Sequence, residues 1–257
     1  MAFAHPPRVA RKPAAADQHA NVFSVEGTAA NTAFSLPQVR LVNPTAARRI
    51  NKVLVQHFNA VNGDTLVCTA RQAVRSAEAM FRENNKQGFR GYEFQVLYNA
   101  HGVLSLELAI TELSEHEQVT GSHITFDLRT GRQFSLADFI FDTTALKRKW
   151  NQQVNESTEE SVTSAKKYFA QDSASFTYFK QRVGWDDSRQ ASTLHAAVEF
   201  AFTADGLSLF CHHDLPLPWN ELQPQEEYPF GWEELRLWWR KTGTWRGLIR
   251  YGLNKKH

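Results

Sequence analysis

Two short stretches of the sequence combine residue types that can do chemistry. Gly121-Ser122-His123 places a hydroxyl beside an imidazole, and Cys211-His212-His213-Asp214 places four potential metal ligands in a row. An imidazole serves as a base or a ligand near neutral pH, and thiolate, imidazole and carboxylate are the groups that bind zinc. The secondary structure that carries these residues decides which of these roles is open to them.

The first stretch begins a predicted strand, SHITFDL. Thr125 and Asp127 point to one face, and the intervening apolar residues point to the other, as in a half-buried antiparallel strand. Arg-Thr-Gly at 129–131 predicts a tight turn shaped by Asp127, with Gly131 supplying a positive φ. No nucleophile or carboxylate stands at a known catalytic spacing from His123, so a structural role is the favoured interpretation.

The second stretch ends a predicted hairpin, TLHAAVEFAFTADGLSLFCHH, with Asp205-Gly206 at its tip. Neighbours on a strand face opposite sides, so at most two of the four residues 211–214 can share an ion. A zinc site would need a further ligand such as His101, His123 or His195. The favoured interpretation is a strand end entering a Pro-rich loop. The alternative is a metal-assisted hydrolase of glycan or peptide that uses Cys211, His213 and a distant histidine.

Motifs of other enzyme classes are absent from the sequence. It contains no G-x-S-x-G elbow, H-E-x-x-H helix, P-loop or G-x-G-x-x-G turn. Its paired acids, such as Glu226-Glu227, are sequence neighbours, and adjacent acids seldom converge on one glycosidic bond. The sequence therefore predicts a protein without catalytic residues, metal or cofactor.

Periodicity predicts the elements around these stretches. Apolar residues at helical spacing indicate helices over 45–60 and 69–85, and a helical region in two pieces follows the strand at SHITFDL. YEFQVLYNAHGVLSLELAITEL indicates two strands around the turn at 99–102, and WEELRLWW a short last helix. This order predicts an α+β fold, with a mostly antiparallel sheet and helices packed on one face.

Composition suggests three regions: a flexible N-terminal lead at 1–33, a single α+β domain at 34–241 and a basic tail at 242–257. Seven basic residues and no acid lie from Leu235 onward, which leaves 22 basic and 27 acidic side chains before it, a net charge of about −5. An acidic body with a basic end is the main electrostatic asymmetry. The tail would bind nucleic acid only nonspecifically.

Other composition features bear on location. No apolar run reaches the roughly 20 residues of a membrane span, and the first 20 residues hold no apolar core of the length that a secretory signal needs. Taken as complete, the chain would be cytoplasmic, and a mature chain whose signal has been removed would look the same. Cys68 and Cys211 are expected to be buried thiols rather than a disulfide. Many aromatic residues gather in the last forty positions, where tryptophans beside arginines could anchor a protein, sugar or base.

Several segments together resemble a family of bacterial envelope domains of largely unknown function. These are GVLSLEL from Gly102, TGSH from Thr120, TFDLRTG from Thr125, FSLADF from Phe134, ADGLSLF from Ala204 and YPFGWEEL from Tyr228. The likeness covers about 34–239 and is most specific over 102–139. Thr120 and Ser122 replace the Gly and Ala of the family pattern, and the loop at 212–219 differs.

The resemblance implies a function by binding. Such domains form the extracellular, lysozyme-sensing part of certain anti-sigma factors and an N-terminal part of some peptidoglycan deacetylases. It implies a periplasmic or extracellular location and a lysozyme-like hydrolase or peptidoglycan as partner. The expected contact residues lie at strand tips and in the Pro-rich loop: His101, His123, Trp219, Tyr228 and Trp232. A third hypothesis is a cytoplasmic interaction or immunity-type protein that binds through its basic, Trp-rich tail.

Overall fold

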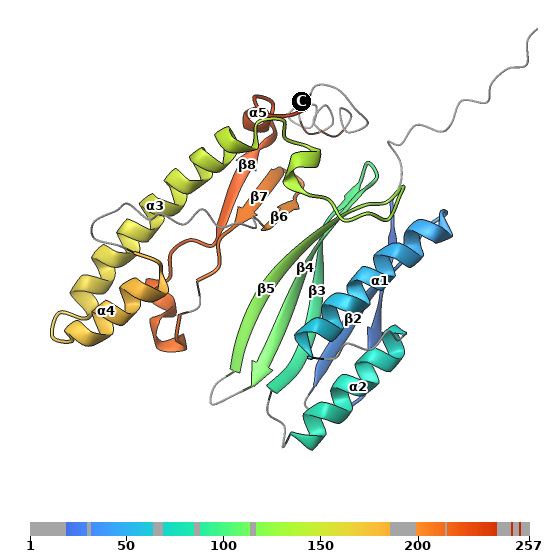
Figure 1. Cartoon of the computed structure of the whole chain (residues 1–257), viewed down its shortest axis with the longest axis horizontal. Helices are drawn as coiled ribbons and strands as arrows, with labels where there is room; N and C mark the ends of the chain where they lie inside the picture. The colour runs from blue at the N-terminus through green and yellow to red at the C-terminus, as the bar shows by residue number, and fades with distance from the viewer. Residues whose placement is uncertain are drawn as a thin grey trace, which may run out of the picture.

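The protein has two β-sheets, each covered by its own helices (Figure 1). The computed structural model describes residues 19–29, 32–63, 69–84, 88–113, 117–185, 199–213 and 215–240, together with Leu248 and Gly252. Cys68 and His195, which the sequence analysis names, lie outside these residues. The predicted α+β class, with a mostly antiparallel sheet, is confirmed.

The first sheet has five strands in sequential order. They are β1 (Asn21–Glu26), β2 (Ala33–Arg40), β3 (Gly88–Ala100), β4 (Val103–Leu113) and β5 (Glu117–Asp127). Among the described strands of this sheet, β2 and β3 pair in parallel and the other neighbours pair antiparallel. β5 is therefore an edge strand, a position that matters for the site described below.

Helices α1 (Pro44–Val61) and α2 (Ala70–Glu83) cover one face of this sheet (Figure 1). Asn43 caps α1 through its side chain and Pro44 occupies the first turn, while Thr69 and Gln72 form a capping box on α2. The centre of the apolar stripe of α1 is fully buried, with Ile50, Leu54 and Phe58 at 0% exposure. These helices confirm the periodicity read from the sequence.

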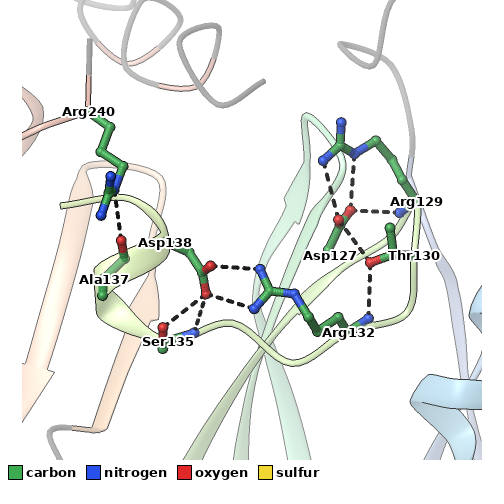
Figure 2. A network of polar contacts seen from close by, with 8 residues as sticks. All are labelled: Asp127, Arg129, Thr130, Arg132, Ser135, Ala137, Asp138 and Arg240. Carbon is green, nitrogen blue, oxygen red and sulfur yellow. Dashed lines mark hydrogen bonds and ion pairs between the residues drawn. The ribbon is translucent and has the colours of Figure 1, made fainter. Parts of the chain in front are cut away.

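The turn after β5 is locked onto α1. Gly131 has φ 73°, and its amide donates to the Asp127 carbonyl at 2.7 Å. The Asp127 carboxylate accepts from the Arg129 amide at 2.9 Å and from the Thr130 hydroxyl at 3.0 Å (Figure 2). A Cβ on Gly131 would lie 2.3 Å from the Ala46 carbonyl oxygen. The predicted turn is therefore confirmed, and glycine is required there by both conformation and space.

The chain after this turn ties the first sheet to the second. The Arg132 guanidinium donates to both carboxylate oxygens of Asp138, at 2.7 and 3.1 Å, and Ser135 donates to the same carboxylate (Figure 2). Arg240 then donates through Nε to the Ala137 carbonyl at 2.8 Å. This segment connects β5 to the residues that follow the second sheet.

The second sheet is formed by β6 (Glu199–Phe202), β7 (Gly206–Phe210) and β8 (Glu227–Gly231). The predicted late hairpin therefore does not extend the first sheet but begins a separate one. Its core includes Trp150 of α3 (Thr143–Tyr168) and Trp232 of α5 (Trp232–Leu235). A smaller cluster joins α3, α4 (Ser173–Arg182) and the 3-10 helix η3 (Leu217–Leu222).

The two sheets meet where β6 lies against β4 and β5. The Ser105 hydroxyl accepts the Phe202 amide at 3.0 Å and lies 2.9 Å from the Thr125 hydroxyl. Consequently the last part of β5 is buried on both faces: Thr125 and Asp127 are 2% and 3% exposed. The expectation of a half-buried strand is wrong here, because the second sheet covers the face that the sequence suggested was solvated.

Two predicted boundaries also differ. Within the expected flexible lead, Asn21–Glu26 forms β1 and pairs with β2. Within the expected tail, Leu248 is 2% exposed in the second core, and the site of a Gly252 Cβ lies 2.2 Å from the Trp232 ring. Residues 1–18 and 30–31 of the predicted lead and most of 242–257 lie outside the described residues. No helix in the described ranges is long and apolar enough to cross a membrane.

Candidate functional site

A carboxylate lies between two imidazoles at the junction of the sheets. Glu199 Oε2 is 3.2 Å from His123 Nδ1 and 3.4 Å from His212 Nε2, and it also accepts the His123 amide at 3.1 Å. The three ligand atoms lie within 4.8 Å of one another. The His123 side chain is buried, whereas those of Glu199 and His212 are each about one third exposed, so the group opens to solvent beside these two.

Strand register brings these three residues together. Glu199 pairs with Phe210 in the β6–β7 hairpin, and His212 follows Phe210 by two residues on the same side. The Phe210 ring stacks on His123 of β5, with centroids 3.4 Å apart and planes 9° apart. The hairpin therefore supplies a carboxylate, a stacking ring and an imidazole to a histidine of the first sheet.

The cluster is strongly polarised. Burial acts to raise the pKa of Glu199, but its hydrogen bonds with His123 and His212 and the positive charge of His212 hold it at about 2. Bonds to Glu199 and Glu226 raise the pKa of His212 to about 9, against the opposing effect of burial. Burial likewise acts to raise the pKa of Glu226, and His212 with the His213 amide lowers it. At neutral pH His212 is thus a cation between two carboxylates.

Gly121 leaves space beside the cluster. A Cβ on Gly121 would lie 3.7 Å from His212 Cε1, 3.9 Å from His123 Cε1 and 3.9 Å from Glu107 Oε1. These are ordinary contact distances, so a methyl group would fit in this space. Because residue 121 is glycine, it places no side chain there. The Glu107 carboxylate therefore borders the same opening.

Along the outer edge of β5, backbone groups point away from the sheet. The Thr125 carbonyl accepts from Phe134, the Asp127 amide donates to Arg132, and the His123 amide donates to Glu199. Backbone groups two residues apart face the same way, so those of Val119 and Gly121 also point outward. In the described part of the chain, no strand pairs with this edge beyond the Phe126–Gln133 bridge.

Two cavities lie along this edge, one after the other. The larger is about 540 Å³ and the smaller about 290 Å³. Ser122–Thr125 line the larger one and Gln118–Gly121 the smaller one. His57, Lys147 and Glu199 also line the larger cavity. His212, Asn220 and Glu226 also line the smaller one. Glu199 and His212 thus stand between the two.

The five predicted contact residues do not gather at one place. His123 belongs to the cluster. Trp219 is half-buried against Phe169, next to Asn220 of the smaller cavity. The other three lie elsewhere: His101 in the β3–β4 turn with φ 55°, and Tyr228 and Trp232 in the second core at 2% and 5% exposure. Ligand contact by the five residues stays a prediction. The burial of Tyr228 and Trp232 disfavours it for these two.

Cys211 and His213 form a second pair, with Sγ 3.7 Å from Nε2. Cys211 is 3% exposed, and burial together with Glu226 raises its pKa to about 11. A thiol with so high a pKa is a weak nucleophile at neutral pH. The prediction that Cys211 is buried is confirmed, and neither Cys211 nor His213 belongs to the group of three ligand atoms.

Sequence reasoning missed Glu199, the pairing of His212 with it, and the role of Glu226. Glu226 is treated in the sequence only as one of a pair of neighbouring acids, but its carboxylate lies 3.9 Å from His212 Nδ1 and accepts the His213 amide at 3.1 Å. A signal existed for one contact: the Asp205-Gly206 turn fixes the hairpin register that brings Glu199 and His212 to the same side.

No protein-family model matches the chain, and no curated protein matches it. Among solved structures it is similar to a DUF3298 family protein from Bacteroides fragilis NCTC 9343, with TM-score 0.56 and 13% identity over 92% of this chain and 99% of that one. A DUF3298 family protein from Pseudomonas aeruginosa PAO1 gives TM-score 0.49 and 13% identity, over 90% and 96%. The first likeness establishes a shared fold, which agrees with the resemblance to a domain family of unknown function.

Proposed function

We propose that this chain is a non-catalytic binding domain of the bacterial cell envelope, and that it binds a protein ligand along the outer edge of β5. The observation that carries the proposal is the set of outward backbone groups at Val119 and Gly121, which face the smaller of the two cavities along this edge. An uncovered strand edge binds an extended segment through main-chain hydrogen bonds, and flanking cavities accept its side chains.

The charge of this region favours a basic ligand. Three carboxylates, those of Glu199, Glu226 and Glu107, lie at or beside the opening and outnumber its two cations, His212 and Lys147. The chain before Leu235 also has a net charge of about −5. Opposite charge increases the rate of encounter and disfavours wrong partners. Together with the sequence resemblance, this supports a basic, lysozyme-like hydrolase as the ligand, in preference to peptidoglycan.

Calorimetric titration of the full chain tests the proposal. The titrants are a basic lysozyme, the same enzyme with its lysines acetylated, and soluble peptidoglycan fragments, each at low and at physiological salt. The expected result is saturable binding of the unmodified lysozyme that weakens with salt and with acetylation, because screening reduces attraction between exposed charges. Binding of the glycan fragments alone would replace the hydrolase by peptidoglycan, and binding of none of them would overturn the proposal.

A further inference from the structure

We propose that His123, Glu199 and His212 bind one divalent transition-metal ion of the zinc class. This site does not depend on the proposed hydrolase ligand, because three side chains of this chain would hold the ion whether or not a protein binds.

The spacing of the ligand atoms fits such an ion. Two ligands bound at about 2.0–2.2 Å in a tetrahedron lie about 3.3–3.5 Å apart. Glu199 Oε2 lies 3.2 Å from one imidazole nitrogen and 3.4 Å from the other. The two nitrogens lie within 4.8 Å of each other, and the His212 side chain, 32% exposed, leaves the cluster accessible to an ion from solvent.

The surrounding residues hold the ligands in place. His123 is held by its stacked contact with Phe210, and its amide fixes the Glu199 carboxylate. Glu226 faces His212 Nδ1 at 3.9 Å, on the other side of the ring from Glu199. A carboxylate at this position orients a metal-binding histidine and directs its second nitrogen to the ion.

The cluster also leaves room for a further ligand. Residue 121 contributes no side chain to the space beside His123 and His212, which the Glu107 carboxylate borders. Two histidines, one carboxylate and an open position form a ligand set typical of zinc sites that keep a water. Calcium and magnesium prefer all-oxygen ligands, so the histidines select against them.

Metal titration of the untagged, chelator-treated full chain tests this site. Calorimetry with Zn²⁺ is expected to give one ion per chain, and Co²⁺ is expected to give the visible absorption of a four-coordinate ion. Glu199→Gln and His212→Ala should each lower the zinc affinity tenfold or more. Both variants keep buried His123 intact, and circular dichroism checks that they fold. His101 lies in the β3–β4 turn and serves as the control: His101→Ala should bind zinc as tightly as the unmodified chain does.

Three results would overturn the inference. The first is no saturable binding, which would leave the cluster as an ion-pair network alone. The second is equal affinity in the unmodified chain, Glu199→Gln and His212→Ala. The third is loss of binding in Cys211→Ser or His213→Ala while Glu199→Gln still binds, which would assign the metal to the thiol–imidazole pair instead.

Discussion

The Ser105 hydroxyl accepts the Phe202 amide at 3.0 Å, and this bond joins the two sheets inside the protein. Both partners are fully buried at 0% exposure. The bond sets the position of β6 on β4, and therefore the position of Glu199 relative to His123. The proposed metal site, which takes ligands from both sheets, therefore includes residues on either side of this contact.

Ser105→Ala should destabilise the protein by about 1–3 kcal/mol, because the Phe202 amide would remain buried without its acceptor. Thr125→Val removes the neighbouring hydroxyl but leaves that bond in place, so its cost should be smaller. Urea unfolding of both variants measures the difference. An equal or larger loss in Thr125→Val would show that the amide bond is not the main polar contact between the sheets.

Gly131→Ala should cost about 2 kcal/mol or more, because a left-handed residue gains strain from a Cβ and this Cβ would lie 2.3 Å from the Ala46 carbonyl oxygen. Gly63→Ala is the matched control, since Gly63 has φ 71° and nothing within 4 Å of its Cβ position. Its cost should stay near 1 kcal/mol. Equal unfolding midpoints for the two variants would contradict the tight packing of the turn on α1.

The sequence predicted elements well wherever a local pattern was sufficient. The buried stripe and the Asn43 cap located α1, and the Asp205-Gly206 turn located the β6–β7 hairpin. β1 was missed because its six residues lie in an Ala-rich lead and gain their stability from pairing with β2. Strand pairing between distant segments is a tertiary effect that residue pattern alone does not specify.

The site was less predictable for a similar reason. His123 and Glu199 are separated by 76 residues, and they meet because one sheet lies against the other. The alternation in β5 indicated a polar face, and a solvated face is the commoner outcome for such a pattern. Only the packing of β6 on that face turns Thr125 and His123 into buried, hydrogen-bonded residues.

Asp138→Asn should reduce stability at neutral pH by roughly 0.5–1 kcal/mol, as expected for a partly exposed ion pair. Partial burial acts to raise the pKa of Asp138, but bonds from Arg132 and Ser135 lower it below its ordinary value (Figure 2). A carboxyl with a depressed folded pKa stabilises the fold above its unfolded pKa of about 3.9, and this contribution is lost as the pH falls through the folded value.

The stability difference between Asp138→Asn and the unmodified chain should therefore shrink from pH 7 to about pH 3, the acid end of the titration of an aspartate. Urea unfolding at both pH values measures it, with Glu159→Gln on the exposed face of α3 as the control for removing a surface carboxylate. A stability difference that is constant with pH would mean that the Arg132–Asp138 ion pair does not cause the loss of stability in Asp138→Asn.

The central claim, that a protein ligand binds along the outer edge of β5, is tested most directly by comparing Val119→Pro with Val119→Thr. Val119 is 65% exposed, and proline removes its outward amide without removing a bond to β4, whereas threonine keeps that amide and the branched shape. In calorimetric titration with a basic lysozyme, Val119→Pro should weaken binding about tenfold and Val119→Thr should change it little. Equal, strong binding by both variants would contradict edge binding.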